Sequence, residues 1–97
     1  MENTLKKQIF KSLETWLSCN LSVYNYASKY EWEDELNKLL YKIDLGVIDK
    51  FILYASDADN TFNDNKFSIQ DLKEHYVDII DKASEIALRM LSENDDI

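Results

Sequence analysis

The chain has 97 residues, of which 45% are apolar and 12% are aromatic. This length excludes a chain of two full domains, and the apolar content excludes a wholly disordered chain, which could not offset its ordering entropy. Nineteen acidic and eleven basic residues give a formal net charge of −8, which disfavours binding to nucleic acid or to an anionic membrane and favours a cationic partner.

The single cysteine, Cys19, cannot form an internal disulfide, so the chain needs no oxidising compartment to hold its shape. Polar residues interrupt the apolar positions of residues 1–17, which therefore lack the continuous core of a signal peptide. No later segment has the roughly 18 consecutive apolar residues of a membrane span. We expect a cytoplasmic protein that does not enter the membrane.

One glycine and no proline argue against a hairpin-rich sheet, so helices are expected throughout. The first predicted helix covers residues 4–18, where apolar residues recur every three or four positions. A second helical stretch runs from about residue 22 to residue 44 and can break near residues 28–31. Gly46 suits the C′ position after this helix, because glycine adopts the left-handed conformation at little cost.

Residues 47–55 are interpreted as a short, largely buried helix, because a lone strand would leave its backbone groups unpaired. Asp and Asn side chains compete for backbone hydrogen bonds, which makes residues 56–67 the main loop. Ser68, followed by Asp71, resembles a capping box that starts the last helix.

The last helix is predicted as one continuous element, because apolar residues recur at helical spacing from Ile69 to Leu91. Residues 93–97 are expected to fray. The predicted fold is therefore a single all-α domain over residues 1–97, a compact antiparallel bundle of four to five helices.

The charge is unevenly distributed along the chain. Residues 1–43 hold six acids and six bases, whereas residues 44–97 hold thirteen acids and five bases. A further acidic cluster occupies residues 31–35, beside the tyrosines of residues 24–30. The acids expected on the main loop and along the outer face of the last helix are Asp57, Asp59, Asp64, Asp71, Glu74, Asp78, Asp81 and Glu85.

These acids have two interpretations, a solvated face that keeps the protein soluble or a binding surface. The six tyrosines and two tryptophans favour binding, because such side chains are enriched at interface hot spots. Helical spacing predicts a packing role for Trp16, Tyr26, Tyr41 and Tyr76. The aromatic interface candidates are Trp32, Tyr24 and Tyr54.

Catalysis finds little support in the residue pattern. The only histidine, His75, has no serine or cysteine at a spacing that would make a nucleophile pair, and it is expected on the surface of the last helix. Cys19 is expected to be a buried or half-buried thiol. Residues 60–71 partly match a calcium-binding EF-hand loop, but Phe62 and Asn65 occupy positions that need an oxygen ligand and a glycine. No enzyme activity, metal or cofactor is predicted.

The stretch from Asp49 to Glu74, DKFILYASDADNTFNDNKFSIQDLKE, is similar in layout to the colicin-nuclease immunity proteins. In that family a short helix carrying paired tyrosines precedes an acidic loop and a final helix, and Tyr54 matches one of those tyrosines. By composition, the whole chain also resembles the immunity proteins of contact-dependent growth inhibition systems. The resemblance implies a cytosolic protein that binds one toxin domain, often a ribonuclease, and blocks its active site or substrate path.

The resemblance implies a basic nuclease domain bound one to one, and the negative charge of this chain is complementary to the positive clefts that such domains carry for phosphates. Two other classes stay open. A phage-type inhibitor that mimics nucleic acid would have the same composition, and a helical adaptor or scaffold subunit would use an exposed apolar patch. The predicted partner-binding residues are Tyr54, Asp57, Asp59, Asp64, Asp71, Glu74 and Asp78, with Trp32, Glu33 and Glu35 as a second candidate patch.

Overall fold

Apolar residues at helical spacing form five α-helices and one short 3₁₀ turn within residues 2–57 and 67–94, the ranges that the computed structural model describes. Within these ranges there is no strand, and the predicted all-α bundle is confirmed. The elements are α1 (Glu2–Asn20), η1 (Val23–Asn25), α2 (Lys29–Leu40), α3 (Gly46–Ser56), α4 (Ile69–Glu74) and α5 (Tyr76–Asn94).

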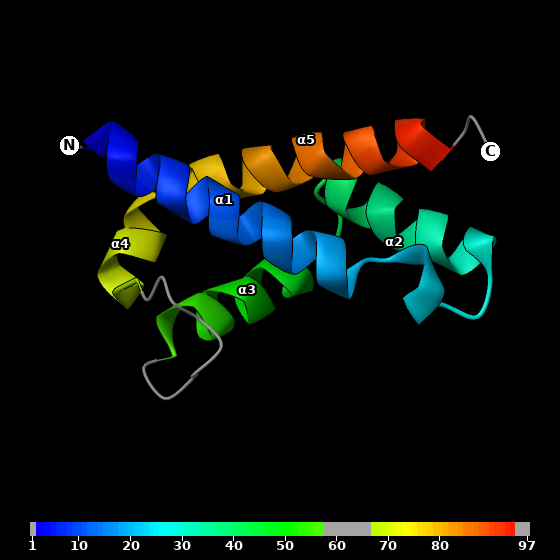
Figure 1. The fold of residues 1–97 in the computed structure, drawn as a ribbon, viewed down its shortest axis with the longest axis horizontal. Helices are drawn as coiled ribbons and strands as arrows, with labels where there is room; N and C mark the ends of the chain where they lie inside the picture. The colour runs from blue at the N-terminus through cyan, green and yellow to red at the C-terminus, as the bar shows by residue number, and fades with distance from the viewer. Residues whose placement is uncertain (1, 58–66, 95–97) are drawn as a thin grey trace.

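The two longest helices, α1 and α5, lie side by side and run in the same direction (Figure 1). Two ion pairs mark this register, one from Lys6 to Asp78 near the start of both helices and one from Glu14 to Arg89 further along. By contrast, α2 and α3 run opposite to α5, as expected for an antiparallel bundle (Figure 1). The bundle is thus mixed, because α2 and α3 return the chain to its starting end before α5 begins.

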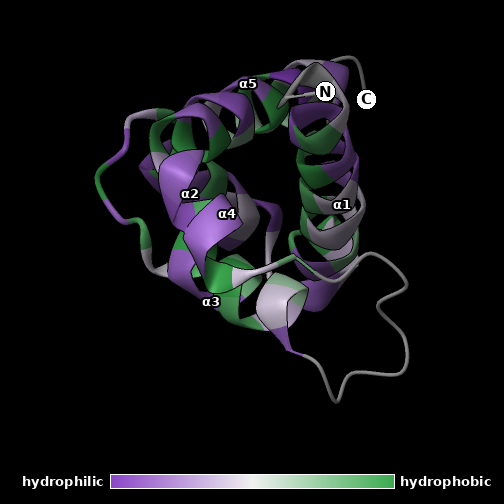
Figure 2. Cartoon of the chain, turned by 90° about the vertical axis from the view of Figure 1, so that its left-hand side faces the viewer, coloured by the Kyte–Doolittle hydropathy of each residue, from purple (hydrophilic) through white to green (hydrophobic). Residues whose placement is uncertain are grey.

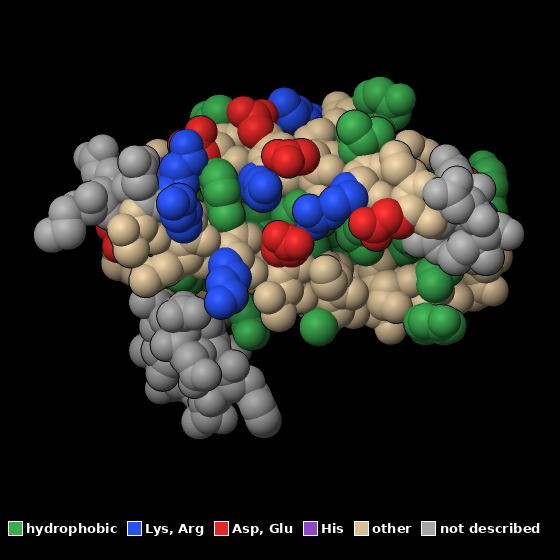
Figure 3. Space-filling model, turned by 45° about the horizontal axis from the view of Figure 1, so that its top comes forward, with side chains coloured by type: hydrophobic (Ala, Val, Ile, Leu, Met, Phe, Trp, Pro, Cys, Tyr) green, Lys and Arg blue, Asp and Glu red, His purple; other side chains and the backbone are tan. Residues whose placement is uncertain are grey.

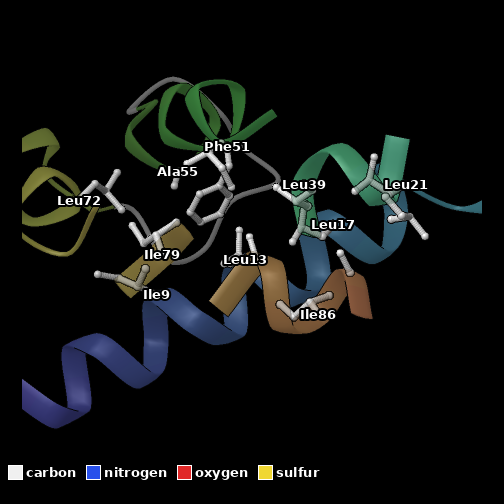
Figure 4. Packing of buried hydrophobic residues seen from close by; sticks show 14 of the residues in the cluster. Ile9, Leu13, Leu17, Leu21, Leu39, Phe51, Ala55, Leu72, Ile79 and Ile86 are labelled. Carbon is white, nitrogen blue, oxygen red and sulfur yellow. The ribbon is translucent and has the colours of Figure 1, made fainter. Parts of the chain in front are cut away.

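The core is formed by the apolar stripe of each helix, and hydrophobic positions face the interior of the bundle (Figure 2). Side chains from α1, α3 and α5 converge around Phe51, which is fully buried (Figure 4). Among the described residues, the other fully buried large side chains are Ile9, Leu13, Leu17, Trp32, Leu36, Leu39, Ile48, Leu72, Ile79 and Ile86. No helix in the described ranges combines the length and apolarity needed to cross a bilayer.

Trp32 belongs to this core, so its prediction as a surface contact is wrong. Its side chain is 1% exposed, and its Nε1–H donates a hydrogen bond of 2.6 Å to the backbone oxygen of Leu21. The acidic neighbours in the sequence suggested an exposed position for Trp32. In the structure, α2 turns Glu31 and Glu33 outward while Trp32 points inward. Trp32 therefore ties α2 to the end of α1.

The end of α2 differs from the prediction. The helix stops at Leu40, and the left-handed residue after it is Lys42, with φ of 58°, not Gly46. The N–H of Ile43 donates to the oxygen of Lys38 and the N–H of Lys42 to that of Leu39, which is the hydrogen-bond pattern of a Schellman motif. Gly46 instead begins α3, where Asp44 Oδ1 accepts its N–H at 2.9 Å.

The predicted continuous last helix is divided at His75 into α4 and α5. The helix axis turns at His75, so α4 packs against α3 while α5 runs along α1 and α2 (Figure 1). The capping interaction at the start of α4 is confirmed, since Ser68 Oγ accepts the N–H of Asp71 at 3.1 Å. Because of the break, Asp71 and Glu74 do not lie on the same helix as Asp78.

The short helix predicted at residues 47–55 is confirmed as α3, with one buried stripe and an exposed Leu53. Three of the four aromatic residues predicted to pack do contact the core, and these are Trp16, Tyr26 and Tyr76. The fourth, Tyr41, is 68% exposed because α2 has already ended. Cys19 is also exposed, contrary to prediction, since it lies in the last turn of α1 away from the core stripe.

Candidate partner-binding surface

The outer side of α3 carries Val47, Lys50, Tyr54 and, directly after the helix, Asp57. Successive positions are three or four residues apart, so they form one stripe along the helix. This stripe lies beside the buried stripe of Ile48, Phe51 and Ala55. The Tyr54 ring packs against Trp16 of α1, with centroids 6.2 Å apart, which fixes the half-buried Tyr54 at the edge of the core. Asp57 lies beyond it and is exposed.

A backbone hydrogen bond joins the end of α3 to the start of α4. The N–H of Phe67 donates to the oxygen of Ala55 at 3.0 Å, and the Phe67 side chain is buried. Ser68 then caps α4, whose first turn contains Asp71. Asp57 and Asp71 therefore lie at the same end of the molecule, where α4 adjoins α3 (Figure 1).

Two predicted binding residues of the main loop, Asp59 and Asp64, lie outside the described residues, as does most of the predicted loop and of the partial EF-hand pattern. The prediction for these positions stays a prediction. Within the described ranges, no group of three or more His, Cys, Asp or Glu side chains is placed to hold a metal ion.

Many of the remaining acids are neutralised by bases on the same molecule. Lys6 reaches Asp78 at 3.4 Å and Lys42 reaches Asp81 at 2.8 Å, so two bases from the first half of the chain offset acids of α5. On the face formed by α1 and α5, basic and acidic side chains alternate (Figure 3). The expected one-sign face along the last helix is therefore absent there. The carboxylates of the described residues that pair with Lys or Arg include Glu14, Glu33, Asp34, Glu35, Asp78, Asp81 and Glu85.

The acids around α3 and α4 have a different environment. Asp44, Asp49, Asp71 and Glu74 form no ion pair with a lysine or arginine of the described residues. Three of them accept hydrogen bonds from neutral donors, as Asp44 does from the N–H of Gly46. The Tyr76 hydroxyl donates to Asp49 Oδ1 at 3.3 Å, and Gln70 Nε2 donates to Glu74 Oε1 at 3.3 Å.

The pKa of Tyr76 is raised by partial burial and, secondarily, by the negative charge of Asp49. This direction is the one expected for a phenol that is partly buried beside a carboxylate. Residues 44–74 hold seven acids and three bases, so the region has a formal charge of −4. We call Asp49, Asp57, Asp71 and Glu74 the acidic end, and Lys50 and Lys73 are the bases of the adjoining helices.

The second predicted patch, on α2, is partly neutralised. Lys29 pairs with Glu33 at 3.8 Å, and Lys38 lies 3.3 Å from both Asp34 and Glu35. The pKa of Lys38 is raised by its hydrogen bond to Glu35 and then by the one to Asp34, which shows that these carboxylates stabilise the ammonium form.

Two tyrosines near the start of α2, at the end of the bundle away from α4, are highly exposed. Tyr24, in η1, is 93% exposed, and Tyr30, in the first turn of α2, is 79% exposed. The turn is held by Asn25, whose Nδ2 donates to the backbone oxygens of Cys19 and Asn20. From the sequence, Tyr30 is only a neighbour of the acidic cluster and is not among the interface candidates.

His75 lies between α4 and α5, with its Nδ1 3.8 Å from Asp78 Oδ2. Its backbone N–H donates to the oxygen of Asp71, and its own oxygen accepts the N–H of Ile79. These contacts give His75 a role in joining the two helices.

No protein-family model, curated protein or solved structure matches this chain. The similarity to immunity proteins therefore stays a prediction, and the distribution of neutralised and non-neutralised carboxylates is the feature that bears on function.

Proposed function

We propose that this protein is an immunity protein, which binds a basic toxin domain of nuclease type and covers its positively charged cleft with the acidic end. One observation carries the proposal. Seven carboxylates of α1, α2 and α5 pair with lysine or arginine, whereas Asp49, Asp71 and Glu74 have no such ion pair among the described residues. Charge that is not offset within the molecule is available to attract a cationic partner.

The electrostatics support rapid association with such a partner. A net charge of −8 on a chain of 97 residues creates a long-range field, and complementary fields can raise association rates to about 10⁸–10⁹ M⁻¹s⁻¹ at low salt. Affinity then depends on a few buried anchors. Tyr54 is suited to this role, because it is half-buried against Trp16 and precedes Asp57 by one helical turn.

A helical adaptor is the second candidate function, and the exposed Tyr24 and Tyr30 favour it. These tyrosines lie at the end of the bundle where α2 begins, away from α4 (Figure 1). An adaptor would use this end and would show little dependence on salt.

The test is a charge-reversal variant carrying Asp57→Lys, Asp71→Lys and Glu74→Lys. We expect it to lose protection when co-expressed with basic nuclease toxin domains that the unaltered protein neutralises. For the purified pair, its association rate should fall by about tenfold or more at low salt, because steering depends on complementary charge. Growth rescue and stopped-flow association over a range of salt concentrations measure the two effects.

The matched control carries Glu31→Lys, Glu33→Lys and Asp34→Lys, which changes the net charge equally at the other end of the bundle. It should keep protection. Equal loss in both triple variants would indicate a general charge effect, and loss in the control alone would assign binding to α2. Either result contradicts the proposed surface, and the absence of rescue by the unaltered protein across basic nucleases would contradict the proposed partner class.

A further inference from the structure

Four exposed hydrophobic side chains lie on one side of the bundle, where the end of α2 adjoins α5. They are Tyr41, Ile43, Val77 and Leu88, and each is between 52% and 75% exposed. Single exposed hydrophobic residues are normal on a protein surface, whereas a group of them indicates contact with another molecule. None of the four belongs to the acidic end.

Two hydrogen bonds join the end of α2 to the middle of α5. Lys42 Nζ donates to Asp81 Oδ1 at 2.8 Å, and Ser84 Oγ donates to the backbone oxygen of Leu40 at 2.6 Å. The residues on either side of Lys42 therefore lie beside the part of α5 around Asp81. They belong to the connection from α2 to α3, which lies at the outer edge of the molecule (Figure 2).

The side of α5 that makes these contacts also carries the other two hydrophobic residues. Val77 lies four residues before Asp81, and Leu88 lies four residues after Ser84. Residues four apart share one side of a helix, so Val77 and Leu88 flank the contacts with α2. We call the following six residues the apolar patch: Tyr41, Lys42, Ile43, Val77, Asp81 and Leu88.

The apolar patch has no net charge, since its one base, Lys42, pairs with its one acid, Asp81. Of the acids next to the patch in the sequence or on α5, Asp78 and Glu85 also pair with lysines, while Asp44 has no such pair within the described ranges. The net charge of −8 thus lies outside the patch. The patch fits a partner surface that is mainly apolar and carries one charge of each sign.

We propose that the apolar patch binds the same patch of a second copy of this chain, which gives a symmetric dimer. A two-fold axis makes each contact reciprocal, so Lys42 of either copy faces Asp81 of the other. The ion pair can then exchange partners between the copies without leaving a charge unpaired, and the hydrophobic side chains cover one another. This inference goes beyond the proposed function and does not depend on it.

The size of the patch limits the affinity. A stable interface uses about 20–30 residues of each partner, many more than the six residues here, and two copies of net charge −8 repel each other. We expect a Kd of roughly 0.1–1 mM in about 0.15 M NaCl. The protein should therefore be monomeric at low micromolar concentration and dimeric at high concentration.

The experiment exchanges the two charges between copies. Lys42→Asp places an acid opposite Asp81, and Asp81→Lys places a base opposite Lys42, so each variant alone should dimerise at least about tenfold more weakly. An equimolar mixture should recover the affinity of the unaltered protein, because the introduced acid of one copy meets the introduced base of the other. Aspartate tolerates the positive φ of residue 42.

The measurement is the rotational correlation time of the ¹⁵N-labelled chain, by NMR, from about 0.02 to about 2 mM protein. For the mixture, labelled Lys42→Asp is titrated with unlabelled Asp81→Lys. These variants also separate a local contact from overall repulsion. Asp81→Lys makes the net charge two units less negative than −8, so repulsion alone would make it dimerise more tightly than the unaltered protein.

A second pair of variants tests the hydrophobic part of the patch. Ile43→Ser with Val77→Ser should weaken dimerisation by at least about tenfold, because both side chains are largely exposed in the monomer and covered in the dimer. The matched control is Tyr24→Ser with Tyr30→Ser, which removes two equally exposed side chains at the start of α2. The control should dimerise like the unaltered protein.

A monomer at about 2 mM would overturn the proposal, and so would a mixture of the charge variants that fails to associate. Stronger dimerisation by Asp81→Lys alone, or equal loss in the tyrosine control, would show that the patch is not the contact. Each of these results leaves the proposed function unchanged, because that function is tested through the acidic end. Conversely, loss of toxin neutralisation by the acidic-end variant leaves the dimer unaffected.

Discussion

Trp32 and Tyr24 are both large aromatic residues in the region where the chain passes from η1 into α2, yet one is buried and the other is exposed. Trp32 is 1% exposed and donates its indole hydrogen bond to Leu21, whereas Tyr24 is 93% exposed. Trp32 lies between two glutamates and Tyr24 lies between Val23 and Asn25, so residue type and local composition do not identify Trp32 as the buried one. The decisive difference is position relative to Leu36 and Leu39, with which Trp32 shares the buried side of α2.

Replacing Trp32 with phenylalanine is expected to lower the free energy of unfolding by about 1–3 kcal/mol, because the buried oxygen of Leu21 loses its donor. Replacement with alanine should cost about 3–5 kcal/mol, since it adds a core cavity. Urea unfolding measures both values. Tyr24→Ala is the control, and an exposed substitution of this kind should change stability by no more than about 0.5 kcal/mol. Equal losses at the two positions would contradict the assignment of Trp32 to the core.

At the level of elements, the ends of helices differ most from expectation. Lys42 adopts the left-handed conformation that the sequence suggested for Gly46, and Gly46 starts α3. The hydrogen bonds from Ile43 and Lys42 to the last turn of α2 determine this geometry. The positive φ at Lys42, a residue with a Cβ, still costs about 1–2 kcal/mol.

Replacing Lys42 with glycine is therefore expected to raise the free energy of unfolding by about 0.5–1 kcal/mol at high salt. High salt is needed because Lys42 also pairs with Asp81 at 2.8 Å, and an exposed pair is worth about 0–1 kcal/mol until it is screened. Urea unfolding in about 0.5 M NaCl gives the comparison. Asp81→Asn, which removes the pair and keeps the backbone, should be neutral there, and a destabilised glycine variant would show that the backbone at Lys42 is not strained.

The existence and type of the helices could be predicted from the sequence because apolar spacing reports the buried stripe directly. The cap at Ser68 could also be predicted, since it depends on residues only three apart. The break at His75 could not, because it follows from where α3 and α1 lie, and these helices are distant in sequence. For the same reason the ion pair from Lys6 to Asp78 was not foreseeable, and the acids of α5 were assigned to a binding face.

At the level of the whole molecule, the parallel arrangement of α1 and α5 determines the surface charge. It places Lys6 and Glu14 beside Asp78 and Arg89, so the face formed by α1 and α5 combines both signs (Figure 3). The excess negative charge is thereby confined to smaller areas, of which the acidic end is one.

Stability should decrease at alkaline pH, because the pKa values of Tyr26 and Tyr76 are raised above 10.0 by burial and nearby carboxylates. A raised pKa in the folded state means that the neutral form is favoured there. This stabilisation is fully present below the unfolded pKa near 10.0 and is lost as pH rises through the higher folded value. The raised pKa of Lys38 acts with the same sign.

The measurement is urea unfolding from about pH 9 to pH 11.5. Tyr76→Phe should reduce the alkaline fall in the free energy of unfolding, and Asp49→Asn should reduce it less, because burial is the larger cause for Tyr76. An identical alkaline slope in the unaltered protein and in Tyr76→Phe would contradict the linkage.

The direction of α5 also determines which binding surface stays accessible when the protein is immobilised. Its 19 residues extend about 28 Å, from the end that carries α4 to the end where α2 begins (Figure 1). An anchor attached through the C-terminal end of α5 would crowd Tyr24 and Tyr30 while leaving Asp71 and Glu74 open to solution. An anchor at the start of α1 would do the reverse, so comparing capture by the two immobilised forms would tell the immunity and adaptor surfaces apart without any substitution.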